Sequence, residues 1–547
     1  MAQPTQNSGG TAPAHPGATP SAGHALQHKV FRLLWIATVI SNIGSWMYNA
    51  ASGWLMTSLN PDPFIVSLVQ VANSLPLFLF ALPAGALADM IDKRRFILTL
   101  EILTSLFSAL FALLVAVRVV TPGVLLLFTL LVSILGALET PAWQAIVPLL
   151  VPPQALSSAV AANSLGVNIS RVIGPALGGV VILGFGIAAP FWLDAVSNLG
   201  VIGVILWWRP APKRAQALPA EHLASAMRAG VRYARNNPQL RATLLRSIGF
   251  FLFASAYWAL LPVLASRQLH GGPTLYGVLL GAIGAGAVAG AFLLPRLKAK
   301  SGADAVVIFG EAGTAAALIL FGLAPDAAIA VLACLIAGVS WIVVLASLNV
   351  SAQVALADWV RGRGLAAYVT VFFGTMSAGS ALWGLVAARL GLPAAHYLAA
   401  AGALVALFAT RRWRLHSGPE ADLTPSMHWP EPVLAAGVSP DAGPVLVTVE
   451  YTVPAENRGA FLQALERVAR ERRRDGAYRW QLFRDVAHPE RMLETFLVDS
   501  WLEHLRQHRR VTNADRVVQE QVRHLTREAP RVTHYIGADA QGERHEG

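Results

Sequence analysis

The sequence predicts an all-α polytopic membrane protein, with twelve transmembrane helices in two six-helix halves, followed by a small C-terminal α+β domain. The chain of 547 residues is 55% hydrophobic and only 13% charged, with a mean hydropathy of +0.52, whereas charged residues make up about a quarter of a soluble protein. Five segments also lack Lys, Arg, Asp and Glu and are longer than the roughly 20 residues that cross a bilayer: 33–61, 63–88, 268–295, 327–357 and 364–388.

Turn signals divide the longer apolar stretches into twelve candidate spans. Examples of these signals are Asn60-Pro61, Thr121-Pro122-Gly123 and Val151-Pro152-Pro153. Six spans precede and six follow the polar stretch 209–243. The spans lie near 30–56, 64–88, 96–118, 122–148, 156–183, 188–208, 244–266, 275–296, 304–323, 327–351, 364–388 and 393–412.

The distribution of Lys and Arg predicts the orientation. With both termini cytoplasmic, the outside loops contain only Arg118, Arg267 and Arg389, and the other basic residues near span ends lie inside. We therefore expect a multi-pass protein of the cell (inner) membrane. Its net charge of +11 fits a basic cytoplasmic face against anionic lipid and requires no nucleic acid. The single cysteine, Cys334, excludes an intrachain disulfide and a cysteine-based metal site.

Composition predicts six regions along the chain. The linker between the halves contains a basic amphipathic helix that we expect on the inner leaflet. The regions are a disordered cytoplasmic N-terminal tail (1–28), the N-terminal six-helix half (29–208), the cytoplasmic linker with its amphipathic helix (209–243), the C-terminal six-helix half (244–414), a Pro-rich linker (415–443) and a cytoplasmic α+β domain (444–547).

The turn between spans 2 and 3 carries an unusual concentration of charge, "GALADMIDKRR" at residues 85–95. Gly85 allows two helices to approach closely, and the basic triplet anchors the turn on the inside. Anchoring does not explain Asp89.

This stretch resembles the signature that the major facilitator superfamily carries between its second and third helices, roughly G-x-L-x-D-R-x-G-R-R. It departs at Met90, where Arg is usual, and at Asp92, where Gly is common. The second departure resembles the transmembrane secretion effector branch, which includes enterobactin-type exporters. Segments 139–152, 171–179 and 361–384 are similar to other parts of the superfamily or of this branch, so the resemblance covers about residues 28–415.

Asp89 and the Arg361-Gly-Arg363 loop fall on the cytoplasmic side, one in each half. A carboxylate facing a helix N-terminus and a guanidinium is attracted to both. This suggests a latch that closes the cytoplasmic side; the alternative is that these charges only fix the topology. The candidate cytoplasmic gate consists of Gly85, Asp89, Asp92, Lys93, Arg94, Arg95, Arg361 and Arg363.

Two further groups of residues lie within the predicted spans. Gly174, Pro175, Gly178 and Gly179 in span 5 form a helix-packing motif that resembles the end of the superfamily's antiporter motif; simple close packing is the alternative. The intramembrane charges Glu101, Glu139, Arg171 and Asp194 are costly in lipid and are candidates for proton coupling or structural pairing. Glu139 and Asp194 are the favoured proton carriers, Glu139 and Arg171 could pair, and Asp194 could face a water-exposed vestibule.

The superfamily resemblance implies a central cavity lined by spans 1, 2, 4, 5, 7, 8, 10 and 11. A wide apolar cavity with dispersed amides and aromatic rings favours a bulky amphipathic ligand over a sugar or an inorganic ion. The candidate cavity residues are Asn42, Trp46, Asn49, Gln70, Asn73, Trp143, Gln144, Asn168, Tyr257, Trp258, Trp341, Asn349 and Phe373.

The C-terminal region changes to a soluble, charged composition. Its pattern predicts the order βαββαβ, which is that of a ferredoxin-like domain. It resembles the dimeric α/β barrel of antibiotic-biosynthesis-monooxygenase-like domains, with Glu494, Trp501, His504 and His508 near the expected places. His504 and His508 have an i, i+4 spacing, but the sequence does not place the third ligand that a metal site needs.

The sequence thus predicts a proton-coupled exporter (antiporter) of a bulky amphipathic small molecule, such as a siderophore or drug, that works by alternating access. No GxxxxGK[ST] motif supports ATP-driven transport, and no cofactor or metal is predicted. The expected partners are the small-molecule substrate, protons and the lipid bilayer, with dimerisation through the C-terminal domain as a further hypothesis. The alternatives are a transporter fused to a cofactor-free monooxygenase-like enzyme and a transport-inactive receptor that signals through the C-terminal domain.

Overall fold

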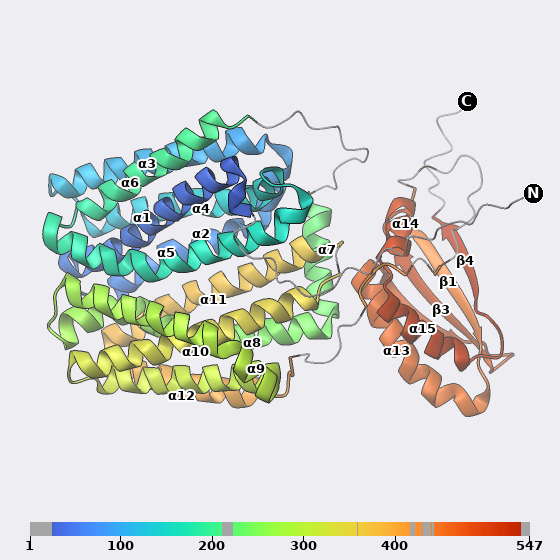
Figure 1. Ribbon diagram of the computed structural model, residues 1–547. Helices are drawn as coiled ribbons and strands as arrows, with labels where there is room; N and C mark the ends of the chain where they lie inside the picture. The colour runs from blue at the N-terminus through green and yellow to red at the C-terminus, as the bar shows by residue number, and fades with distance from the viewer. Residues whose placement is uncertain are drawn as a thin grey trace, which may run out of the picture.

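The computed structural model describes residues 25–209, 223–357, 359–415, 422–426, 428–429, 439 and 442–537, without the side chains of 82, 85–86, 88–90, 153 and 223–229. It contains a long helical bundle and a smaller domain with a β-sheet (Figure 1). Most of the predicted N-terminal tail lies outside the described residues. Residues Ala25–Gln27 form a short 3-10 helix, and the Ala25 amide donates to Ser158 Oγ at 3.0 Å.

Among the described residues, eleven helices are long and apolar enough to cross a bilayer. They agree closely with the predicted spans. They are α1 (Lys29–Leu59), α2 (Pro63–Met90), α3 (Lys93–Ala116), α4 (Pro122–Ile146), α5 (Leu156–Phe185), α6 (Ala189–Trp207), α8 (Pro238–Val263), α9 (Pro273–Leu323), α10 (Ala327–Val354), α11 (Arg361–Leu390) and α12 (Leu392–Thr410).

Helix α9 contains two of the predicted spans. Its 51 residues include one non-helical residue, Gly302, with φ 77° and ψ 169°. A straight helix of this length would extend roughly 76 Å, whereas the hydrocarbon core is about 30 Å thick. The predicted spans 275–296 and 304–323 lie on either side of Gly302, where the missing side chain permits the positive φ.

Polar caps followed by proline start several of the helices. Asp62 accepts the Phe64 amide at 2.8 Å, and Asn237 accepts the amides of Gln239 and Leu240 at 2.9 and 3.0 Å. Each cap precedes a proline at the first helical position, where no amide hydrogen is needed. Because of the Asn237 cap, α8 begins at Pro238, ahead of the predicted boundary at residue 244.

The two halves repeat the same turn at their last helix pair. Gly186 between α5 and α6 has φ 87°, and Gly391 between α11 and α12 has φ 88°. In each case a proline lies within the first two positions of the following helix. Repeated local geometry at matching positions is typical of transporters built from structural repeats.

The helical halves lie side by side, with α1–α6 in blue to teal and α8–α12 in green to orange (Figure 1). Helix α2 packs along α11, and α5 packs along α9. We call the end of the bundle next to α7 the α7 end and the opposite end the far end. The α7 end is where α2, α4 and α10 finish and where α1, α3, α5, α8 and α11 begin.

Helix α7 (Leu223–Asn236) is the predicted amphipathic helix of the linker. It packs against α11 of the bundle and α13 of the C-terminal domain. Tyr233 is buried and donates its hydroxyl to the Ala355 carbonyl at 3.1 Å. One face of α7 is therefore covered by protein, and its predicted position on the inner leaflet stays a prediction.

The C-terminal domain contains four antiparallel strands in the order β2-β3-β1-β4. Helices pack on one face of this sheet, as Figure 1 shows. The chain order is β1 (Val445–Thr452), α13 (Arg458–Asp475), β2 (Tyr478–Arg484), β3 (Arg491–Val498), α14 (Trp501–Arg510), α15 (Asn513–His524) and β4 (Arg531–Ile536).

Charged contacts join the C-terminal domain to the α7 end of the bundle. Arg232 on α7 forms an ion pair with Glu503 at 3.5 Å. The Arg510 guanidinium lies 4.5 Å from the ring centre of Trp359, and that of Arg474 lies 5.6 Å from the ring centre of Tyr233. The domain is thus docked on α7 and on the segment before α11.

Candidate transport site

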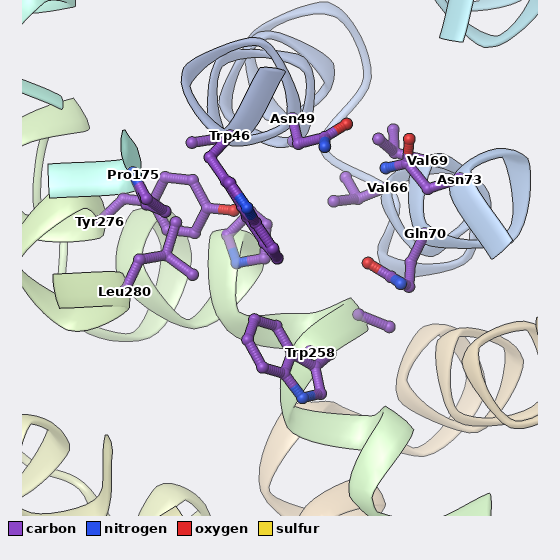
Figure 2. Close-up of a pocket in the computed structure, with 14 residues that line it drawn as sticks. Trp46, Asn49, Val66, Val69, Gln70, Asn73, Pro175, Trp258, Tyr276 and Leu280 are labelled. Atoms are coloured by element: carbon purple, nitrogen blue, oxygen red, sulfur yellow. The ribbon is translucent and has the colours of Figure 1, made fainter. Parts of the chain in front are cut away.

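A pocket lies between the two halves of the bundle. It encloses about 520 Å³ when the open space at its mouth is counted. Figure 2 shows Trp46 from α1, Gln70 from α2 and Trp258 from α8 pointing into the same space. Tyr276 and Leu280 from α9 complete one side, so both halves contribute to the walls.

A second, smaller pocket adjoins the first and shares Trp46, Pro175, Trp258 and Leu280 with it. Its other walls are mainly apolar residues of α9. Arg171 of α5 and Trp341 of α10 also line it. The combined space is therefore aromatic and apolar, with a guanidinium on one wall.

Six of the thirteen candidate cavity residues line these two pockets: Trp46, Asn49, Gln70, Asn73, Trp258 and Trp341. Seven do not: Asn42, Trp143, Gln144, Asn168, Tyr257, Asn349 and Phe373. Tyr257 is fully buried in an aromatic cluster with Phe321 and Trp341. Asn168 is exposed and donates to the Ser164 carbonyl of its own helix.

Arg171 is half-buried and has no acidic partner among the described residues. Its guanidinium lies 5.4 Å from the ring centre of Trp46, and its Nε has no hydrogen-bond acceptor in the described part of the chain. Glu139 was the expected partner. The structure instead places the guanidinium against an aromatic ring at the pocket wall, where it can attract an anion.

Glu139 interacts with another acid. Its side chain lies beside that of Glu101, which is buried on the neighbouring helix α3. Two carboxylates in such a position repel each other when both are charged, so the arrangement favours a proton on one of them. The sequence treated Glu101 as a separate residue because the contact depends on how α3 packs against α4.

Asp194 has a different environment. It is only 1% exposed and accepts hydrogen bonds from Ser45 Oγ at 3.0 Å and Ser108 Oγ at 2.6 Å. It therefore lies between α1, α3 and α6 rather than in the water-exposed vestibule suggested from the sequence. Neither pocket includes it.

The C-terminal half also contains an intramembrane acid, Glu311, but this acid has a basic partner. Arg246, which is fully buried, forms ion pairs with Asp304 at 2.5 Å and with Glu311 at 3.6 Å. Asp304 also accepts the Leu415 amide at 2.9 Å. Arg246 thus balances part of the negative charge of these two acids within the fold.

The glycine motif of span 5 allows α5 to pack closely against two neighbouring helices, α1 and α9. A Cβ on Gly178 would lie 3.3 Å from Met47 Cα of α1, and a Cβ on Gly179 would lie 3.0 Å from Gly277 Cα of α9. Gly174 likewise faces the backbone of α1, and Pro175 lines both pockets. The Gly179–Gly277 contact joins the two halves near the far end.

Asp92 and Arg94 of the candidate gate make local structural contacts. Asp92 caps α3 by accepting the Arg95 amide at 2.8 Å. Arg94 donates to the carbonyls of Ile205 and Leu206 on α6, both at 2.9 Å. Lys93, Arg361 and Arg363 lie at the α7 end. The structure does not describe the surroundings of Gly85 or the side chain of Asp89.

In the C-terminal domain, Glu494 is fully buried among hydrogen-bond donors. Tyr451 donates to it at 2.7 Å and Trp480 at 2.8 Å, and Arg472 forms an ion pair with it at 3.5 Å. Its oxygens are thus engaged within the sheet, which favours a structural role. Burial lowers the pKa of His504 to about 3 and that of His508 to about 4, so both imidazoles are neutral at pH 7.

Two packed helical halves around a central pocket define a multi-pass membrane transporter of the major facilitator type. Solved structures share this fold: the nucleoside transporter NupG has a TM-score of 0.52 at 13% identity, covering 70% of this chain and 99% of that one. A bacterial homologue of the iron transporter ferroportin, in an inward-facing state, has a TM-score of 0.53 at 13% identity, covering 70% and 98%.

The chain belongs to the transmembrane secretion effector family, whose model matches residues 20–542. It is 26% identical over 258 residues to the staphyloferrin A transporter of Staphylococcus aureus, covering 47% of this chain and 64% of that protein. It is 25% identical over 300 residues to the enterobactin exporter of Shigella boydii, covering 54% and 71%. The match to the staphyloferrin A transporter thus spans less than two thirds of its length. The family and the fold are those of membrane transporters.

Proposed function

We propose that the protein exports a bulky amphipathic anion in exchange for protons, by alternating access. The observation that carries this proposal is Arg171, which is half-buried at the wall of an aromatic pocket and has no acidic partner among the described residues. Taking an ion out of water costs several kcal/mol unless a partner compensates it. An anionic substrate would supply that partner.

The remainder of the pocket favours a ligand with large apolar or aromatic surfaces. Trp46, Trp258 and Trp341 line it, and the amides of Asn49 and Gln70 are the dispersed polar groups. Aromatic rings of a ligand can stack on these indoles, while the amides fix its orientation. The relatives named for staphyloferrin A and enterobactin support a siderophore as the substrate class.

The Glu101–Glu139 pair is the proposed proton carrier. The two neighbouring carboxyl groups repel each other when both are charged, so one of them can hold a proton and release it when the pair becomes hydrated. Both residues lie on helices of the same half as Arg171. Opening of the cavity to alternate sides would expose this proton to one compartment at a time.

Alternating access requires one end of the bundle to open while the other closes. The glycine contact between α5 and α9 lies toward the far end, which supports a conformation closed at that end. We propose that the α7 end is cytoplasmic, that α9 contributes two of twelve crossings, and that Asp89 engages Arg361 or Arg363 when the cytoplasmic end closes.

A binding experiment tests the substrate class. Purified full-length protein in detergent would be titrated with enterobactin, staphyloferrin A, a neutral aromatic dye and a cationic dye, with tryptophan fluorescence as the readout. We expect an anion to bind in preference to the dyes. Arg171→Gln should weaken anion binding about tenfold or more, since a hydrogen bond to a charged group contributes about 1.5–3 kcal/mol.

Arg389→Gln is the matched control, because Arg389 is exposed at the far end of α11. It should bind the anion as the wild type does. Equal binding by wild type and Arg171→Gln, or a preference for the cationic dye, would contradict the proposed substrate class.

The proposed role of the C-terminal domain is self-association of its ferredoxin-like sheet. The helices cover one face, and the strand register places Tyr535, Leu446, Leu497 and Tyr478 in one row across the opposite face. Tyr535 is 54% exposed, and Phe483, on the same face, is 49% exposed. An apolar row of this kind favours burial against a second copy.

Mass photometry of the full-length protein tests this association. The wild type should contain dimers, and Tyr535→Glu should convert them to monomers, because the row would then bury an unpaired charge. A monomeric wild type, or dimers unaffected by Tyr535→Glu combined with Phe483→Glu, would exclude this face as the interface.

A further inference from the structure

Three histidines converge on one point in the C-terminal domain, on the helix-covered side of the sheet. His504 and His508 lie on adjacent turns of α14, and His534 lies on the edge strand β4. One imidazole nitrogen of each lies within 4.8 Å of those of the others. The sequence shows only the pair on α14, because β4 follows it by more than twenty residues and joins it through the fold.

We propose that His504, His508 and His534 form a binding site for a divalent transition-metal ion such as Zn²⁺. The Nε2 atoms of His504 and His508 are 3.2 Å apart. Two imidazole ligands of a tetrahedral zinc ion lie about 3.3 Å apart, because each Zn–N bond is about 2.0–2.1 Å. This pair already has the required spacing, and a modest shift of His534 would bring in the third nitrogen.

Neighbouring side chains fix the orientation of the histidine rings, as the residues behind histidine ligands do in known metal sites. Gln507 Oε1 lies 3.4 Å from His504 Nδ1, so an Nδ1–H can face this acceptor while the Nε2 lone pair faces His508. A polar group behind a histidine ligand fixes its ring in this way in known metal sites. The ring of Trp501 packs against both His504 and His534, with centres 5.4 and 5.8 Å away.

The ligand set indicates which ions fit. Three neutral imidazoles suit Zn²⁺, Co²⁺, Ni²⁺ or Cu²⁺, whereas Mg²⁺ and Ca²⁺ require oxygen ligands. Three protein ligands leave a fourth tetrahedral position for water or another small ligand. Trp429 covers His508 from the segment before β1, with ring centres 4.9 Å apart. The nearby Arg472 is paired with Glu494, which reduces its repulsion of a cation.

Cobalt binding to the full-length protein tests the site. The protein would be purified with a tag that contains no histidine, stripped with a chelator and titrated with Co²⁺, whose visible ligand-field bands report tetrahedral coordination. We expect one equivalent per chain, displaced by Zn²⁺. His534→Gln should weaken binding more than about tenfold, and it is the first choice of variant because His534 is only half-buried on an edge strand.

His488→Gln is the matched control, since His488 is 64% exposed on the β2–β3 turn. It should bind cobalt as the wild type does. His508→Gln gives a second ligand deletion, with size-exclusion elution confirming that each variant is folded. Failure of the wild type to bind one equivalent, octahedral spectra only, or full binding by a folded His534→Gln protein would overturn the proposal. None of these outcomes depends on transport activity.

Discussion

The two halves of the bundle hold their buried charges in different ways. In the C-terminal half, Arg246 is paired with Asp304 and Glu311. In the N-terminal half, Arg171 has no acidic partner among the described residues, and Glu139 lies beside another acid, Glu101. A charge with its partner stabilises the fold, whereas a charge without one is available to a ligand or a proton. In the proposed mechanism, the N-terminal half therefore binds both the anionic substrate and the proton.

The largest expected effect is a difference in protein stability between substitutions of Arg246 and of Arg171. Arg246→Leu leaves two carboxylates without their cation, and removing one member of a buried pair costs about 3–5 kcal/mol. Arg171→Leu removes a charge that has no partner, so stability should be unchanged or higher. Thermal unfolding in detergent would measure both, and similar destabilisation by the two substitutions would contradict the comparison.

A second prediction separates the acids of the N-terminal half. Glu101→Gln should abolish proton-driven accumulation, because the amide cannot release the shared proton. Asp194→Asn should accumulate substrate to within roughly a factor of two of the wild type, which corresponds to less than about 1 kcal/mol. The reason is that Ser45 and Ser108 hold Asp194 away from the pocket. Transport in inside-out vesicles measures both, and loss of coupling in Asp194→Asn alone would reverse this assignment.

A third prediction concerns the aromatic walls. Trp46 lines both pockets, whereas Trp143 packs against the buried residues where α1, α3, α4 and α6 meet. Trp46→Ala should raise the KM for the anion about tenfold, since stacking and burial of an aromatic group contribute about 1–2 kcal/mol. Trp143→Ala should leave KM unchanged in the folded fraction. A larger KM effect at Trp143 would place the substrate elsewhere.

The smallest expected effect comes from substituting Asp92, in the turn between α2 and α3. Asp92→Ala removes the cap of α3 and should cost about 1 kcal/mol of stability. Asp92→Ser keeps a capping oxygen and should restore both stability and transport, measured by thermal unfolding and vesicle flux. If Asp92→Ser were stable but inactive, the aspartate would have a gating role beyond the cap.

Much of the fold follows from local sequence signals. Apolar length and proline-containing turns placed most of the helices within a few residues, and the predicted order of strands in the C-terminal domain agrees with the four strands observed. Trp429 was assigned to a linker, yet it packs on His508, because a polar, proline-rich segment gives no sign of a single tertiary contact.

The site was less predictable because its residues meet only through helix packing. Tyr276 lines the pocket but was not selected, since nothing in its helix distinguishes the face that points inward. Glu101 and Glu139 were both noted as costly charges, but only the packing of α3 on α4 shows that they are neighbours. In the same way, His534 became recognisable only once β4 was placed beside α14.

The most direct test of the proposed coupling is anion accumulation by inside-out vesicles with an acidic interior, comparing wild type with Glu139→Gln. The account predicts that the wild type accumulates enterobactin or staphyloferrin A above its external concentration, and that Glu139→Gln only equilibrates it. Accumulation by Glu139→Gln that still follows the pH gradient would contradict a proton carried by the Glu101–Glu139 pair.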